Sequence, residues 1–303
     1  MITKTLKTPF HRECWNIGLV SKPIAAFLES DWKPEIRWFP QQKHGKYLAD
    51  PFGVVVDERV FVLCEEFDRK KRKGRIVSVE LGTGGEASSP TVAMELPIHV
   101  SYPYLIHDDG NIFCIPETAQ AGEIALYKSD QFPIRWRRVT ALVNFAGHDP
   151  TVFQHEGLWW LACTGETSDQ YSDLFLWYSS RLTGPWAPHP TNPVKRDPRS
   201  SRPAGTPFTH KNNLYRPAQD CSRTYGGRII LNQIETLTDR QFKERPVASI
   251  EPDPHGPYPY GLHTISAVGN VSLVDGKRYA LVRSAFSDAV SRRVAKLRRT
   301  AHI

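Results

Sequence analysis

Five short segments of the chain resemble one another, and their regular spacing is the feature that most restricts the fold. Four of them contain a proline, at positions 51, 103, 150 and 203, and Thr264 takes the corresponding place in the fifth. They recur roughly every 50 residues, a period typical of repeat architectures such as propellers. The segments are Leu48–Val56, Ser101–His107, His148–Gln154, Ser201–Phe208 and Gly261–Ser266.

Each segment is followed by further apolar runs with strand composition. After the first three segments come Val60–Cys64, Asn111–Ile115 and Leu158–Cys163, each preceded by a turn signal. A third run follows in four units, at Arg75–Val79, Glu123–Tyr127, Leu174–Tyr178 and Arg228–Asn232. Four short strands in a unit of this length indicate a propeller blade, with the proline at the start of the inner strand, where a missing N–H costs no ladder bond. The sequence therefore predicts an all-β, five-bladed β-propeller.

The two ends of the chain bear on how the ring closes. The fifth unit is short, because no strand pattern follows Tyr279–Arg283. At the other end, Trp15–Val20 and Ile36–Phe39 are unassigned strands, and we expect them to complete blade five and remove an exposed sheet edge. The propeller is then one domain over residues 1–288, with a basic tail over 289–303. A β-sandwich is the alternative fold, but it does not explain the repeat.

Charge and cysteine content narrow the setting. The net charge is +7, and the tail supplies five of the basic residues, so the rest of the chain is only mildly basic. We therefore expect no nucleic-acid partner, while contact between the tail and an anionic membrane surface stays open. The five cysteines show no metal-site or redox spacing, and we expect no metal and no cofactor. Residues 1–7 contain no continuous apolar segment, which makes a cytoplasmic location the expectation.

The repeat also predicts which side chains meet at the mouth of the central channel. Residues at the starts of inner strands converge there, and residues at the ends of second strands lie near them. The first group is Asp50, Tyr102, Asp149, Arg202 and His263, and the second is Glu65, Glu117, Arg216 and Asp220. We add His99 and His148 as neighbours. Convergent carboxylates in a cleft suit chemistry at a glycosidic bond, where one takes a proton and another donates or tunes.

Structural alternatives stand beside each of these roles. An Asp before a strand often caps a turn, which would explain Asp50 and Asp149 without catalysis. Glu65 and Glu117 would serve equally as paired structural carboxylates. Arg216 and Asp220 would pair with each other, and His263 would orient a carboxylate, hold a water or simply be satisfied in the core.

Several motifs resemble known carbohydrate-active families. The Asp-Pro segments and the late Gly261-Leu-His263 look like the five-bladed propellers of the arabinanase, levansucrase and invertase superfamily, especially glycoside hydrolase family 43. A closer resemblance is to the N-terminal domain of plant glucosamine inositolphosphorylceramide transferase and its bacterial relatives, over roughly residues 13 to 286. Its motifs here are Tyr47–Phe52, Cys64–Phe67, His99–Tyr104, Ile115–Thr118, Asp149–Phe153, Arg202–Gly205, Tyr215–Cys221 and His263–Ser266.

The resemblance implies roles for individual residues. Asp50 stands where the hydrolases keep the general base, Asp149 where they keep the carboxylate that tunes the acid, and His263 matches a late channel histidine. At the fourth-blade position where the hydrolases carry the acid Glu, this chain has Arg202, which cannot donate a proton at working pH. The acid role then falls to Glu117, Glu65 or Asp220. We expect Asp50, Asp149 and Glu117 to be catalytic and the other mouth residues to bind substrate.

Three functions follow from these residues. The first is glycosyl transfer during glycan or glycolipid synthesis, with Asp50 as base and a sugar or glycolipid substrate. The second is a non-catalytic module that binds a glycan or lipid head group beside a separate transferase. Hydrolysis in the manner of family 43 is the third. Arg202 and Arg216 at the mouth favour an anionic or nucleotide-activated ligand, unless Arg202 pairs internally with Glu117 or Asp220.

Overall fold

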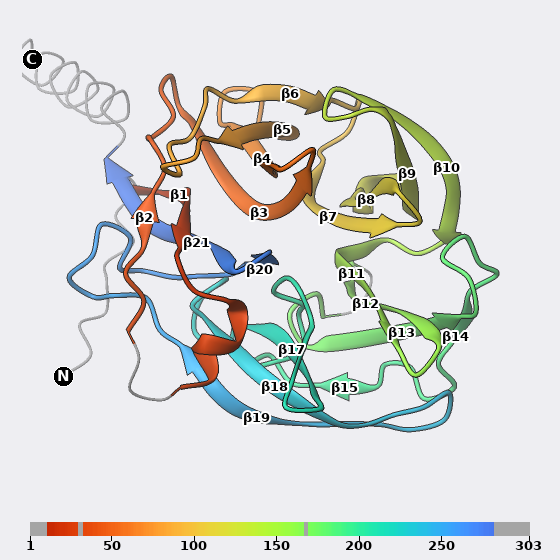
Figure 1. Cartoon of the computed structure of the whole chain (residues 1–303). Helices are drawn as coiled ribbons and strands as arrows, with labels where there is room; N and C mark the ends of the chain where they lie inside the picture. The colour runs from red at the N-terminus through yellow and green to blue at the C-terminus, as the bar shows by residue number, and fades with distance from the viewer. Residues whose placement is uncertain (1–10, 30–32, 167–168, 282–303) are drawn as a thin grey trace, which may run out of the picture.

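The computed structural model describes residues 11–29, 33–166 and 169–281. Five antiparallel sheets are arranged as the blades of a propeller, which confirms the predicted fold (Figure 1). The predicted basic tail lies outside the described residues, as does the end of the predicted domain beyond Leu281. Within the described residues, no helix has the length and apolar character needed to cross a membrane.

Blades one and two each follow the chain from the inner to the outer strand. Blade one has the order β3 (Lys46–Val56), β4 (Arg59–Asp68), β5 (Lys73–Leu81) and β6 (Thr91–Met94). Blade two consists of β7 (Ser101–Asp108), β8 (Asn111–Glu117), β9 (Ile124–Gln131) and β10 (Arg135–Val143), with the short 3-10 helix η2 (Ala119–Ala121) after β8.

Blades three and four differ in their edges. Blade three is built from β11 (Gly147–His155), β12 (Leu158–Gly165), β13 (Asp173–Ser179) and β14 (Ala187–Pro188), and β15 (Lys195–Arg196) also pairs with β13. Blade four has a short inner strand, in the order β16 (Phe208–His210), β17 (Asn213–Asp220), β18 (Arg228–Leu237) and β19 (Phe242–Ile250). Arg202 precedes β16, where Pro203 bridges to Ala218.

Blade five contains both ends of the described chain. Its strand order is β20 (Ile265–Val268), β21 (Val271–Leu281), β1 (His11–Val20) and β2 (Arg37–Trp38), and the 3-10 helix η1 (Ile24–Leu28) follows β1. In Figure 1 the red strand β1 lies between β2 and the blue strand β21. Strand β1 pairs with β21 along its whole length, from His11 opposite Leu281 to Val20 opposite Ser272. The predicted closure is therefore confirmed.

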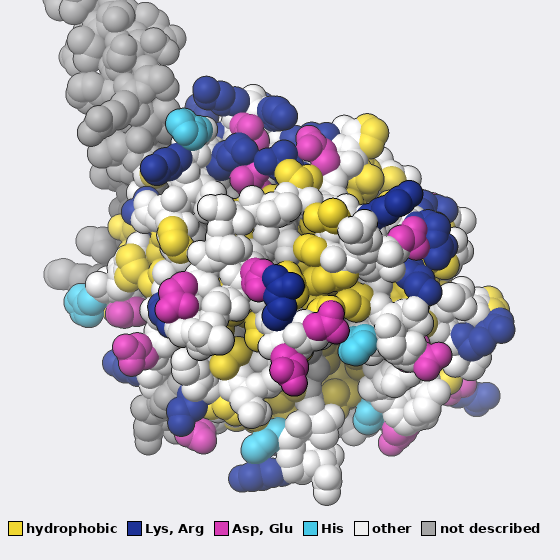
Figure 2. Space-filling view, turned by 45° about the horizontal axis from the view of Figure 1, so that its top comes forward, with side chains coloured by type: hydrophobic (Ala, Val, Ile, Leu, Met, Phe, Trp, Pro, Cys, Tyr) yellow, Lys and Arg dark blue, Asp and Glu magenta, His cyan; other side chains and the backbone are white. Residues whose placement is uncertain are grey.

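The apolar core fills the spaces between neighbouring blades. Between blades two and three, for example, Tyr104, Leu126 and Trp159 belong to one buried cluster. All five cysteines are free thiols, and Cys64 and Cys163, which are completely buried in such clusters, act as small core hydrophobes. Figure 2 shows Lys and Arg side chains gathered along the upper edge of one face, with acidic side chains among them.

Candidate functional site

A recurrent irregularity turns the inner strands toward the channel. In blades one, two and three, the residue before the proline has a left-handed backbone: φ is 52° at Asp50, 44° at Tyr102 and 51° at Asp149. At each of these places the register with the second strand shifts, as in a β-bulge. A non-glycine residue in this conformation costs about 1 kcal/mol or more and is common at functional sites. The bulges explain how Asp50 and Asp149 leave the sheet ladder and reach the cavity.

These residues surround a cavity of about 150 Å³ at the mouth of the channel. It is lined by Trp15, Tyr47, Ala49, Asp50, Glu65, Phe67, His99, Ser101, Glu117, Asp149, Arg202, Tyr225 and His263. The structure thus brings together seven of the residues predicted from the sequence, which are Asp50, Glu65, His99, Glu117, Asp149, Arg202 and His263. The lining combines aromatic rings with charged side chains, a combination suited to a sugar ring with several hydroxyl groups.

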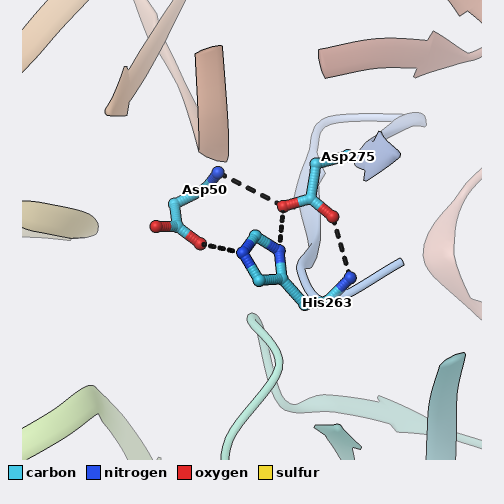
Figure 3. A group of neighbouring side chains, drawn as sticks. All are labelled: Asp50, His263 and Asp275. Atoms are coloured by element: carbon cyan, nitrogen blue, oxygen red, sulfur yellow. Dashed lines mark hydrogen bonds and ion pairs between the residues drawn. The ribbon is translucent and has the colours of Figure 1, made fainter. Parts of the chain in front are cut away.

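Asp50 is buried beside an imidazole and a second carboxylate (Figure 3). Its Oδ1 accepts a hydrogen bond from Thr264 Oγ1 at 2.8 Å and lies 3.7 Å from Nε2 of His263. Burial raises the pKa of Asp50 to about 7, because the charges of Asp149 and Asp275 add to the burial while His263 opposes it only in part. A carboxyl group that titrates near neutral pH is suited to take and release a proton.

His263 is held in place by Asp275 of strand β21. Nδ1 of His263 donates to Oδ2 of Asp275, and the ring stacks on Trp15 with centroids 3.8 Å apart. Burial by itself lowers the pKa of His263, but the carboxylates of Asp275 and Asp50 more than compensate and raise it above its ordinary value. Because Asp275 fixes the proton on Nδ1, the other ring nitrogen faces Asp50.

Asp50, His263 and Asp275 also form a group whose ligand atoms all lie within 4.8 Å of one another, as a metal site requires. The oxygens of Asp275 are already occupied, however. Oδ1 accepts hydrogen bonds from the backbone N–H groups of His263 at 2.8 Å and Thr264 at 3.1 Å. Oδ2 accepts hydrogen bonds from Nδ1–H of His263 and from the backbone N–H of Asp50 at 3.3 Å. Asp275 therefore orients its neighbours, and a cation would have to displace these donors.

On the opposite side of the cavity, Asp149 and Arg202 form a buried ion pair. Arg202 Nε donates to Asp149 Oδ2 at 2.6 Å, and Gln219 Nε2 donates to the same oxygen at 2.6 Å. The guanidinium also lies 5.1 Å above the ring of Tyr225, in a cation–π contact. Arg202 pairs internally, as the alternative interpretation of the sequence held, but its main partner is Asp149, and Glu117 lies 3.9 Å away.

Glu117 is tied to His148. His148 Nδ1 lies 3.1 Å from Glu117 Oε1, and Glu117 Oε2 accepts the backbone N–H of Asp149 at 2.9 Å. Although burial alone would raise it, these contacts and the charge of Arg202 lower the pKa of Glu117 to about 2. Glu117 is thus an ionised, hydrogen-bonded carboxylate. His148 lies behind it rather than in the cavity lining.

Besides His148, three predicted site residues do not line this cavity. Tyr102 is completely buried, and its hydroxyl accepts the N–H of Gly205 at 2.7 Å and contacts Thr151. Arg216 is 1% exposed and pairs with Glu244 at 2.6 Å rather than with Asp220. Asp220 pairs with Arg228 at 2.8 Å. All three side chains are committed to internal partners and have structural roles in this conformation.

Other residues of the site were not predicted. Asp275 directly follows the mainly apolar first half of β21 (Val271–Leu281), and an acidic residue at this place was the available signal. Trp15 enters the site because the closing strand β1 belongs to the same blade as His263. Gln219 lies in β17 and Tyr225 in the loop that follows this strand, and neither stands at a position that the repeat marks.

Comparison with known proteins places the chain in a family. Residues 39–256 match the family model described as glucosamine inositolphosphorylceramide transferase 1, N-terminal. The protein of that name from Oryza sativa subsp. japonica is 34% identical over 207 residues, which cover 66% of this chain and 28% of the relative. The Arabidopsis thaliana protein is 30% identical over 247 residues, which cover 77% and 32%. This chain therefore spans about three tenths of the length of these curated relatives.

Solved structures share the fold. A family 117 glycoside hydrolase from Zobellia galactanivorans superposes with a TM-score of 0.56 at 14% identity, covering 78% of this chain and 88% of the other. A family 43 β-xylosidase/α-arabinofuranosidase from a compost metagenome gives 0.55 at 13% identity, covering 78% and 91%. At these identities the likeness shows the architecture alone. The chain belongs to the family of the N-terminal domain of glucosamine inositolphosphorylceramide transferase 1.

Proposed function

We propose that this chain catalyses glycosyl transfer in glycolipid or glycan biosynthesis at the mouth of the propeller, with Asp50 as the base. The observation that carries the proposal is the buried Asp50 carboxyl, which faces the cavity with a pKa raised to about 7. The names of the relatives refer to transfer and to a glycolipid, and they support this choice of reaction.

The chain's own residues divide the work as follows. The ionised form of Asp50 takes the proton of an acceptor hydroxyl as the oxygen attacks the anomeric carbon of the donor sugar. Thr264, His263 and Asp275 hold the carboxylate in orientation. Asp149 and Glu117 present fixed negative charge to the positive charge that develops on the sugar, and Arg202 keeps Asp149 in place.

The test is turnover of a glucosamine donor, the sugar that the relatives' name suggests. The donor is a nucleoside-diphosphate glucosamine, the acceptor is an inositol-phosphate lipid, and the product is measured by mass spectrometry. Asp50→Asn is expected to reduce turnover by about a hundredfold or more, the usual scale for loss of a general base. Asp149→Asn is expected to give a similar loss with a shifted pH optimum. Full activity of a folded Asp50→Asn protein would refute the role.

The charge of the ligand is a separate part of the proposal. We expect an anionic or nucleotide-activated ligand, but Arg202 and Arg216, which motivated this expectation, are both paired with internal carboxylates. An anionic ligand would therefore have to share Arg202 with Asp149. Calorimetry with a nucleotide sugar, inositol phosphate and neutral sugars tests whether the ligand is anionic. Equal or tighter binding of the neutral sugars would contradict this expectation.

A second candidate is a non-catalytic module that binds a glycan or lipid head group beside a separate transferase. Two observations favour it: the fourth-blade position holds Arg202, and Glu117 is kept ionised by His148. Under this function the chain binds the sugar without turnover, and Asp50→Asn changes affinity alone. The cytoplasmic location expected from the sequence stays a prediction, which fractionation of cells expressing the tagged chain would test.

A further inference from the structure

Glu65 is a second buried carboxyl group in the same cavity. It stands on β4 directly opposite Ala49 of β3, so its backbone lies beside that of Asp50. Its side chain is buried and lines the cavity, yet Oε1 makes no hydrogen bond among the described residues. A buried carboxylate without a hydrogen-bond donor is costly, so the protonated form is favoured at this position.

Two neighbours confine this carboxyl group. A β-carbon at position 74 would lie 2.2 Å from Glu65 Oε1, so the space is available only because residue 74 is glycine. His99 Nδ1 accepts the N–H of Gly74 at 2.9 Å, which leaves the proton of a neutral His99 on Nε2, 3.7 Å from Glu65 Oε1. Burial lowers the pKa of His99, so the ring brings no compensating positive charge to Glu65.

The other two carboxyl groups named as acids from the sequence, Glu117 and Asp220, are unsuited to donate a proton, and so is Asp149, the expected tuning carboxylate. Glu117 is ionised by its contacts with His148 and the backbone of Asp149. Asp220 accepts hydrogen bonds from Ser222 and Arg228 and does not line the cavity. Burial and the charge of Glu117 raise the pKa of Asp149 although Arg202 opposes them, but both of its oxygens already accept donors: Oδ2 accepts Arg202 Nε and Gln219 Nε2, and Oδ1 accepts Arg202 Nη2 at 3.4 Å. Glu65 alone of these four faces the cavity without such donors.

We propose that Glu65 is the general acid of the reaction, with Gly74 and His99 as its positioning residues; this rests on the proposed glycosyl transfer. As the bond between the anomeric carbon and the leaving oxygen breaks, its electron pair stays with that oxygen, which takes the proton of Glu65. In the same step the acceptor oxygen bonds to the anomeric carbon and gives its proton to Asp50. Glu65 ends as a carboxylate and Asp50 as an acid, and exchange with solvent restores both.

The charges that face Glu65 agree with this assignment. Burial raises the pKa of Glu65 well above its ordinary value, and Asp50, Glu117, Asp149 and Asp275 raise it further. The neighbouring titratable groups on other elements are Tyr47 on β3 and the neutral His99, and Arg202 stands across the cavity paired with Asp149. Burial and these charges therefore favour the protonated form of Glu65, which is the form that an acid needs.

The experiment compares two donors that differ only in the leaving group, 4-nitrophenyl glucosaminide and methyl glucosaminide. Nitrophenolate leaves without protonation, whereas methanol needs a proton. We expect Glu65→Gln to lower turnover of the methyl donor by about a hundredfold or more and to leave turnover of the nitrophenyl donor close to the wild-type value. Equal loss with both donors, or no loss with either, would overturn the assignment.

Glu66→Gln is the matched control, because it is the same change at the next residue. Glu66 is buried on the other side of β4, where it pairs with Lys46 at 3.0 Å and Arg75 at 2.7 Å. We expect it to lower the melting temperature and to leave the ratio between the two donors unchanged. A Glu66→Gln protein with the same donor split as Glu65→Gln would show that the effect is structural, and would also overturn the assignment.

Infrared spectroscopy gives a readout that does not depend on turnover. Near neutral pH the wild-type chain is expected to show the C=O band of a protonated carboxyl group that Glu65→Gln loses and Glu66→Gln keeps. Glu65→Asp, which withdraws the carboxyl group from its place beside Gly74, serves if Glu65→Gln does not fold, and is expected to show the donor split. If the wild-type chain turned over neither glucosaminide nor the nucleoside-diphosphate glucosamine, the proposed function would fail. Turnover of the nucleotide sugar alone would keep the proposed function and overturn the acid role of Glu65, because a phosphate leaves without protonation. If Glu65→Gln lost no C=O band relative to the wild-type chain, the assignment of Glu65 itself would be overturned.

Discussion

The carboxylate of Asp275 accepts the Nδ1–H of His263 and, through its other oxygen, the backbone N–H of the same residue. Both residues belong to blade five, and Asp275 is completely buried in the longest strand of that blade. The pair connects the closing blade to Asp50 of blade one, because Asp275 also accepts the N–H of Asp50. The orientation of the proposed base therefore depends on a contact that crosses the closure of the ring.

Replacing Asp275 by Asn tests this contact. The substitution removes the charge that raises the pKa of His263 and places an amide N–H₂ near N–H donors, so we expect the pKa of His263 to fall. An imidazole whose pKa is raised in the folded state stabilises the fold at low pH, and this stabilisation is lost as the pH rises through the raised pKa. The variant should therefore lose most stability on the acid side. NMR titration of the imidazole and urea unfolding, with an expected loss of about 2–4 kcal/mol, measure both effects. An unchanged His263 titration would contradict the contact.

The pH dependence of stability tests the protonation state of Asp50. Because its pKa is raised from 3.8 to about 7, the folded state favours the protonated form, and Asp50 destabilises the fold increasingly as pH rises from about 4 to 7. Asp50→Asn removes this penalty and keeps an acceptor for Thr264. We expect the variant to gain about 2–3 kcal/mol relative to wild type between pH 5 and pH 8, an upper limit set by the size of the shift. A difference in stability that does not change with pH would show that Asp50 is not protonated in this range.

Arg216 and Glu244 form an ion pair in which each side chain is 1% exposed. Arg216→Met leaves the Glu244 carboxylate with only Lys195 as a partner, and we expect a loss of about 3–5 kcal/mol in chemical denaturation. The double variant Arg216→Met/Glu244→Leu should recover much of this loss, because no buried charge then lacks a partner. Neither variant is expected to change ligand affinity. A tenfold weaker affinity with unchanged stability would instead show that Arg216 contacts the ligand.

Closure by β1 is testable by truncation. A chain that begins after Val20 lacks the strand that pairs with β21 from end to end, and it also lacks Trp15 beneath His263. We expect the whole ring to lose cooperative unfolding rather than to fray at one end, because β2 then lacks its partner strand and β21, which keeps β20, becomes an exposed edge. A truncation that stops at residue 10 keeps all of β1 and serves as the control. Cooperative unfolding of both chains at the same temperature would refute the importance of closure.

Much of the fold could be predicted because a blade is a local unit. The alternation of apolar strands and turns within each repeat predicted five blades, and the missing strand after blade five predicted its completion by β1. The same repeat placed Asp50, Asp149 and His263 at one cavity, since equivalent positions of successive blades face the channel. Tyr102 occupies the equivalent position of blade two, but its hydroxyl is held in the core by Gly205, a contact that no repeat could reveal.

The sequence by itself determined the blade architecture, the strand that closes it and the inner positions that carry the charged residues. The tertiary structure alone decided which of those charges meet and in what state. Arg202 pairs with Asp149 and Glu117 with His148, although the two members of each pair come from different blades. Among the residues that the structure describes, none donates a hydrogen bond to Glu65 Oε1. Protonation depends on burial and on the few donors within hydrogen-bond distance, and neither quantity is encoded in the spacing of residues along the chain. Asp275 is an example: its role as an orienting carboxylate follows only from the four hydrogen-bond donors that the packing of the blades places around it.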